Sequence, residues 1–188
     1  PKIFSRYWLH NAMLNMNGEK MSKSLGNIFY IRDFLDKQPG EVLRLALMSG
    51  HYRQPLNWTD DTIEQARGIL DRLYRALKRT EHIETDLSTV DIDSNSVLNA
   101  LCDDLNTSKA LAEIIEISKN LSKADSNDLL IKYKSELVYS ANLMGILQDS
   151  PDNWLGIGKT NNSDQSEKIE SLIKERNNAR ASKNFQRA

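Results

Sequence analysis

The residues best suited to chemistry lie in one short polar segment near the start of the chain. Residues 20–24 read Lys-Met-Ser-Lys-Ser, and Gly18 and Gly26 on either side give the backbone conformational freedom. Two ammonium groups three residues apart can hold anionic oxygens while negative charge develops on a leaving group. The segment predicts a mobile cationic loop for an anion such as phosphate. On residue types alone, an exposed loop without a catalytic role is the main alternative interpretation.

This segment has the pattern of the signature loop of class I aminoacyl-tRNA synthetases, and four further segments resemble the cysteinyl-tRNA synthetases in particular. They occur in the family's order at residues 4–11, 47–57, 103–107 and 169–180. The third of them reads Asp-Asp-Leu-Asn-Thr, where the family usually has Phe in the middle. The resemblance covers about residues 4 to 188 and is weakest in the connecting segments 80–96 and 149–166.

The resemblance implies an ATP-dependent cysteine–tRNA ligase. Such an enzyme first adenylates cysteine with release of pyrophosphate and then transfers the cysteinyl group to the tRNA for cysteine. By the family pattern Lys23 contacts ATP and stabilises the leaving pyrophosphate, and Lys20 supports it, so these two are the predicted catalytic residues. Mg²⁺ is expected to accompany ATP. The predicted ATP-binding residues are the members of the loop: Lys20, Met21, Ser22, Lys23 and Ser24.

The resemblance also implies that this chain is a C-terminal part of the enzyme and is inactive alone. In the family, a His-Ile-Gly-His nucleotide motif and the zinc ligands that recognise cysteine precede the corresponding segment. Zinc is therefore expected in the full-length protein but not in this chain. Cys102 is the only cysteine, and the three histidines, His10, His51 and His82, are far apart in the sequence. Cys102 lies in an apolar helical pattern, which favours a buried, unreactive thiol.

Basic residues recur at helical spacing in two places and are the predicted tRNA contacts. They are Arg72, Arg75 and Arg79 in one row and Arg176, Arg180, Lys183 and Arg187 in the other. Such rows can follow a phosphate backbone, but an ordinary solvated helix face has the same pattern. The net charge of −1 divides into +5 over residues 1–80, −9 over 81–165 and +3 over 166–188. This distribution favours the two ends of the chain as surfaces for a polyanion.

Apolar periodicity predicts a mainly helical chain. Short helices are expected over 31–36 and 41–49, with Gly50 as the cap of the second. A long helix follows an N-cap at Thr59 or Asp60. The remaining predicted elements are helices over 97–105, from Thr107 to 121 and over 130–147, a linker over 149–166, and a last helix from about residue 166.

These elements predict a helical bundle of the anticodon-binding type over residues 59–188. A small α/β remnant that carries the lysine loop is expected before it, over residues 1–58. No apolar run approaches the roughly 20 residues that span a membrane, and a single cysteine fits a reducing compartment. We therefore expect a cytoplasmic, monomeric protein without a membrane partner.

Two alternative functions remain open at this point. One is a related cysteine ligase that acts on an amino sugar, and the other is a non-catalytic RNA-binding helical module with a vestigial loop. The late basic helix favours the tRNA enzyme over the first. The intact pair of lysines argues against the second, because a vestigial loop would be free to lose either of them.

Overall fold

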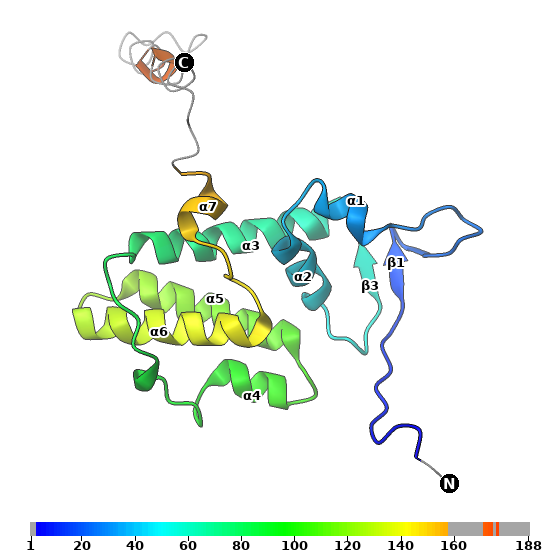
Figure 1. Cartoon of the computed structure of the whole chain (residues 1–188), viewed down its shortest axis with the longest axis horizontal. Helices are drawn as coiled ribbons and strands as arrows, with labels where there is room; N and C mark the ends of the chain where they lie inside the picture. The colour runs from blue at the N-terminus through cyan, green and yellow to red at the C-terminus, as the bar shows by residue number, and fades with distance from the viewer. Residues whose placement is uncertain (1–2, 158–170, 175, 177–188) are drawn as a thin grey trace. The chain divides into compact units, whose positions relative to one another are not determined.

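The computed structural model describes residues 3–157, 171–174 and 176. It divides the chain into two units, Pro1–Pro151 and Asp152–Ala188, which are described separately. The first unit holds a small sheet and a set of packed helices (Figure 1). Across the described residues, no helix has the length and apolar character needed to cross a membrane.

The sheet has three short strands in the order β2-β1-β3. β1 (Leu14–Met16) pairs antiparallel with β2 (Glu19–Lys20) and parallel with β3 (Leu56–Trp58). Asn17 and Gly18 connect β1 to β2 with φ values of 50° and 86°, the combination that an Asn-Gly hairpin turn uses. The prediction of a loop was therefore wrong at Lys20, which belongs to β2.

Two short helices follow the lysine loop, as predicted. They are α1 (Ile31–Leu35) and α2 (Gly40–Met48). Ser49 is the C-cap of α2 and has a right-handed φ of −68°. The prediction of a left-handed glycine cap at Gly50 was wrong. The carbonyls of Ser49 and Gly50 instead accept hydrogen bonds from the side chains of Ser108 (3.1 Å) and Thr107 (3.3 Å), so the helix end is satisfied without a left-handed residue.

The long helix α3 (Asp60–Arg79) begins where the sequence predicts. Thr59 is its N-cap, and the Thr59 hydroxyl accepts a hydrogen bond from the backbone N–H of Thr62 at 3.2 Å. Its apolar stripe is buried against α2 and the helices that follow. Six of its side chains are in the core: Ala66, Leu70, Leu73, Tyr74, Ala76 and Leu77.

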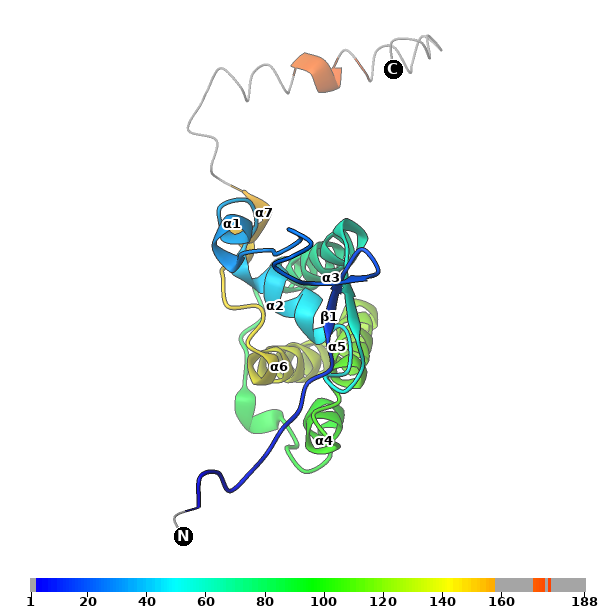
Figure 2. The same cartoon turned by 90° about the vertical axis from the view of Figure 1, so that its right-hand side faces the viewer.

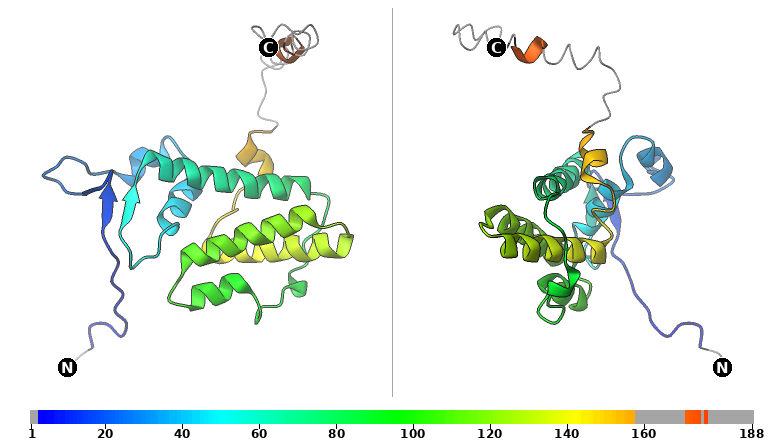
Figure 3. Two further views of the ribbon diagram at one scale, coloured as in Figure 1. Left: turned by 180° about the vertical axis from the view of Figure 1, so that it is seen from behind. Right: turned by 60° about the vertical axis from the view of Figure 1, so that its left-hand side comes forward.

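Three further helices, α4 (Ser96–Cys102), α5 (Thr107–Lys123) and α6 (Asn127–Met144), complete the bundle. Figure 3 shows α5 and α6 side by side, with α3 over one face of the pair and α4 over the other. The sheet lies at one end of this bundle, where β1 comes forward in Figure 2. The predicted mainly helical class is confirmed.

Two predicted boundaries at the α4–α5 turn were wrong. α4 ends at Cys102, three residues before the predicted end, because Asp104 and Leu105 have left-handed φ values of 56° and 52°. The N-cap of α5 is Asn106, not Thr107, and its side chain accepts from the backbone N–H of Lys109 at 3.1 Å. Cys102 is exposed, contrary to prediction, because α4 turns Val97 and Ala100 inward and leaves its last residue on the surface.

The segment after α6 also differs from the prediction. Gly145 ends α6 with a left-handed φ of 63°, so Ile146 and Leu147 lie beyond the helix. A 3₁₀ turn, η1 (Leu87–Thr89), interrupts the connector before α4, and α7 (Pro151–Leu155) occupies part of the expected linker. Residues 158–166 of that linker and most of the last predicted helix lie outside the described residues.

Candidate functional site

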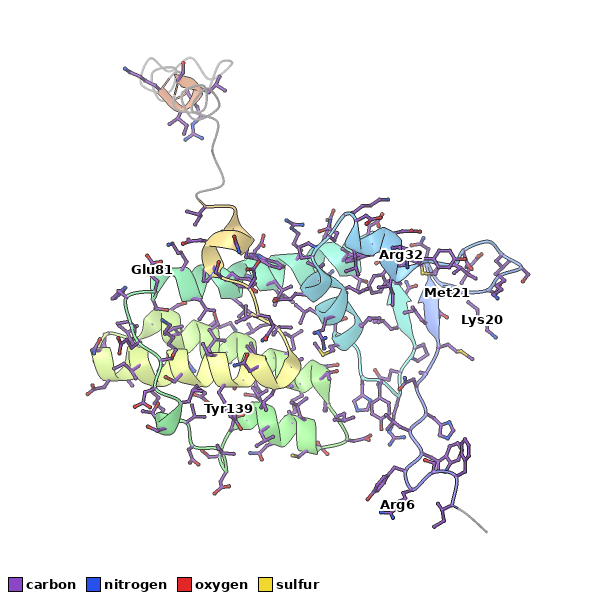
Figure 4. All side chains as sticks on the ribbon, in the orientation of Figure 1. Arg6, Lys20, Met21, Arg32, Glu81 and Tyr139 are labelled. Carbon is purple, nitrogen blue, oxygen red and sulfur yellow. The ribbon has the colours of Figure 1, made fainter. Side chains whose placement is uncertain are left out.

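The lysine loop leaves the edge of the sheet at the end of β2. Lys20 is the last residue of that strand, and Lys23 lies exposed in the turn that follows (Figure 4 labels Lys20 and Met21). The backbone N–H of Gly26 donates to the Lys23 carbonyl at 3.2 Å, with Gly26 at a φ of 66°. A glycine therefore permits the turn that presents Lys23.

Asn27 closes the base of this loop with both ends of its amide. Its Oδ1 accepts the backbone N–H of Ser22 at 2.8 Å, and its Nδ2 donates to the Lys20 carbonyl at 3.2 Å. The Ser22 hydroxyl lies 3.2 Å from that of Ser24 and accepts the N–H of Leu25 at 3.3 Å. The serines thus shape the loop, and Asn27 organises its base, a role that the sequence analysis did not predict.

The hairpin behind the loop is fixed to β3. The Asn57 Oδ1 accepts the Gly18 N–H at 2.7 Å, and the Asn17 N–H donates to the Trp58 carbonyl at 3.2 Å. Lys20 is thereby held on a short, anchored strand. Within the described part of the chain, no carboxylate lies within ion-pair distance of the ammonium group of Lys20 or Lys23. Both charges can therefore meet an anionic ligand.

The structure places Arg72, Arg75 and Arg79 on the exposed face of α3, as predicted from their spacing. Each of these arginines already has a polar contact within the chain. Arg72 Nε donates to the Gly68 carbonyl (3.2 Å), Arg75 Nη2 lies 3.9 Å from Asp71 Oδ2, and Arg79 Nη2 donates to Ser122 Oγ (2.9 Å). These contacts are on the surface, so an RNA phosphate could compete with them.

The second basic row is mostly beyond what the structure describes. Arg176 is helical and exposed in the second unit, whereas Arg180, Lys183 and Arg187 lie outside the described residues. A role for this row therefore stays a prediction.

A polar cluster joins the turn before β3 to the turn before α5. The Asp104 carboxylate accepts Arg53 Nε at 2.6 Å, Arg53 Nη2 at 2.9 Å and the Tyr52 hydroxyl at 2.5 Å. His51 Nε2 lies 3.8 Å from the same carboxylate and its ring stacks on Tyr52. The hydrogen bonds from Arg53 and then Tyr52 hold the pKa of Asp104 well below its usual range, while the bond to Asp104 raises the pKa of Tyr52.

Comparison with known proteins bears on all these features. The family model described as tRNA synthetases class I (C) catalytic domain matches residues 2–68, and the DALR domain model matches residues 96–148. A cysteine–tRNA ligase of Rhodospirillum rubrum is 45% identical over 189 residues, which cover 100% of this chain and 40% of that protein. One of Parvibaculum lavamentivorans is 41% identical over 185 residues, covering 98% of this chain and 39% of that protein.

This chain belongs to the cysteinyl-tRNA synthetase family. The similarity to these relatives runs over the whole chain, and the two family models match separate parts of it. The chain spans about 40% of the length of these curated relatives. The catalytic-domain match contains the lysine loop, and the DALR match contains α4, α5 and α6.

In this synthetase family member, the polar cluster connects the two matched regions. Arg53 lies within the catalytic-domain match and Asp104 within the DALR match. The sequence analysis placed Arg53 and Asp104 in two separate segments that resemble the family, residues 47–57 and 103–107, but did not pair them. The sequence did contain one signal for this pair, because two segments that resemble the family offer an arginine and an aspartate that could form an ion pair. Among the described residues, no three His, Cys, Asp or Glu side chains gather as metal ligands would.

Proposed function

We propose that the protein to which this chain belongs is an ATP-dependent cysteine–tRNA ligase that acts through a cysteinyl-adenylate. The observation that carries the proposal is a lysine loop whose two ammonium groups have no carboxylate partner in the described part of a chain related to cysteine–tRNA ligases along its whole length. The substrates would be ATP, cysteine and the tRNA for cysteine. A cytoplasmic location and a monomeric state belong to the same proposal.

Lys23 is the residue that we assign to the departing pyrophosphate. It stands exposed in the turn, where its side chain can follow the phosphates as charge moves from the α-phosphorus to the leaving group. Lys20, on the anchored end of β2, adds a second positive charge from a fixed position. Met21 and the two serines that shape the loop, Ser22 and Ser24, complete the predicted ATP contacts.

The helical bundle is assigned to tRNA. The row Arg72, Arg75 and Arg79 on α3 would contact phosphates, and Arg176 with Arg180, Lys183 and Arg187 would extend the contact. Mg²⁺ would neutralise charge on the nucleotide. On the family resemblance, we assign zinc to parts of the full-length protein other than this chain. The chain by itself is expected to be inactive.

The test is cysteine-dependent exchange of labelled pyrophosphate into ATP by the full-length protein. Lys23→Ala should slow exchange about 10- to 150-fold, the effect of losing one charge-assisted hydrogen bond in the transition state. Lys37→Ala, which removes an exposed lysine without an ion pair in the described region, should leave the rate unchanged. Absence of cysteine-dependent exchange in the wild-type protein would overturn the proposal.

A further inference from the structure

We propose that Asp104 is a positioning residue that holds the helical bundle in the orientation needed to pass the cysteinyl group to tRNA. The inference rests on the proposed function and adds to it a specific residue for the second step. Asp104 lies in the turn between α4 and α5, far along the chain from the lysine loop, and touches no predicted ATP or tRNA contact. Its three hydrogen bonds all go to the segment before β3.

The geometry of the contact is directional. Arg53 presents Nε and Nη2 to the two different oxygens of Asp104, a bidentate arrangement that fixes the angle between the groups as well as their distance. The Tyr52 hydroxyl adds a third donor to Oδ1. Two consecutive left-handed residues, Asp104 and Leu105, turn the backbone at this point, a conformation that side chains other than glycine rarely adopt. A surface turn retains such backbone strain where its surroundings hold it in place.

A short series of direct bonds connects this contact to the strand that leads to the lysines. The Tyr52 carbonyl accepts the Ala12 N–H at 2.8 Å, and the Met13 carbonyl accepts the Leu56 N–H at 3.2 Å. Ala12 and Met13 directly precede β1, which turns through the hairpin into Lys20. The segment before β3 is thus hydrogen-bonded on one side to the α4–α5 turn. On the other side it is hydrogen-bonded to the residues that lead into the lysine-bearing sheet.

Only the second step of the proposed reaction needs this arrangement. Adenylate formation uses groups of the catalytic domain, whereas a bound tRNA must touch the bundle and reach the adenylate at the same time. A small change in the angle of the bundle would misplace the tRNA end without disturbing ATP. Other junction contacts keep the bundle attached when Asp104 is altered, among them Ser108 to Ser49 and Thr107 to Gly50.

The experiment compares two assays on the full-length protein carrying Asp104→Asn: pyrophosphate exchange without tRNA, and charging of the tRNA for cysteine. We expect kcat/KM for tRNA to fall about 2- to 30-fold, the usual range for residues that couple sites through structure. Pyrophosphate exchange should stay at the wild-type rate. Arg53→Lys, which keeps the charge but loses the bidentate geometry, should show the same selective loss.

Asp103→Asn is the matched control, because it removes the same charge one residue earlier from an exposed side chain that has no hydrogen bond or ion pair within the described residues. Combining Arg53→Lys with Asp104→Asn should add little to the single losses, since both break one contact. Charging equal to wild type, or an equal fall of exchange and charging, would overturn the inference. Failure of the proposed function itself would look different, as the wild-type protein would then lack cysteine-dependent exchange.

Discussion

The Tyr74 hydroxyl on α3 lies 3.0 Å from each oxygen of the Glu41 carboxylate on α2. The same carboxylate accepts the backbone N–H groups of Leu147 (3.0 Å) and Gln148 (2.7 Å), and the Tyr74 hydroxyl accepts that of Asp149 (3.0 Å). Two side chains therefore hold together α2, the long helix α3 and the segment that follows α6. Burial is the main reason that the pKa of Tyr74 is raised above its ordinary value.

Tyr74→Phe should destabilise the protein by about 1–3 kcal/mol, because it leaves the Asp149 N–H without its acceptor and removes a donor from Glu41 in a partly buried site. The free energy of unfolding in urea measures this loss. Tyr139→Phe on α6 is the control, since the Tyr139 hydroxyl has no hydrogen bond within the described residues. Equal effects of the two substitutions would contradict the role given to Tyr74.

Alanine substitutions at Gly68, inside α3, and at Gly145, the C-cap of α6, should change the stability of the protein in opposite directions. Gly145→Ala places a side chain at a φ of 63° and 3.3 Å from Arg44 Nη1, so we expect a loss of about 1–2 kcal/mol. Gly68→Ala lies inside α3, where an added Cβ meets nothing within 4 Å, and should gain about 0.5–1 kcal/mol. Thermal unfolding of both variants checks the pair, and a shared sign would contradict the assigned conformations.

The stabilisation from Asp104 should depend on pH in a defined direction. Because the folded state lowers the pKa of Asp104, the stabilisation is present above the unfolded value of about 3.9 and is lost as pH falls towards the folded value. The difference in unfolding temperature between wild type and Asp104→Asn should therefore be largest near pH 7 and shrink below about pH 4. A wild-type advantage that persists undiminished at pH 3 would argue against the ionised contact.

Signals within a few neighbouring residues were enough to predict α3 and the lysine loop. Thr59 and the apolar stripe define the helix in sequence alone, and the loop residues carry their chemistry in their own side chains. The end of α4 was missed because the contact that accompanies its left-handed turn comes from Arg53, 51 residues away. The prediction of a glycine cap at Gly50 failed for the same reason, because the hydrogen bond at this helix end comes from Thr107 on another helix. Contacts between distant segments leave no periodic pattern for sequence reasoning to find.

Asn27 should matter to catalysis although its side chain carries no charge. Its amide joins the Ser22 N–H to the Lys20 carbonyl and so fixes the spacing between the two ends of the loop. In Asn27→Ala the loop would sample more conformations, and the lysines would lose part of their alignment before the transition state is reached. We expect pyrophosphate exchange by the full-length protein to slow about tenfold, equivalent to about 1.4 kcal/mol.

The form of the Asn27→Ala defect separates alignment from simple binding. If Asn27 aligns the lysines for the transition state, kcat falls while KM for ATP changes little; a loss of ground-state affinity would raise KM instead. Asn99→Ala, which alters an exposed asparagine on α4, is the control and should leave both constants unchanged. A rise in KM at constant kcat would show that the amide serves ATP binding and not the alignment of Lys23, and the role assigned here to Asn27 would have to be abandoned.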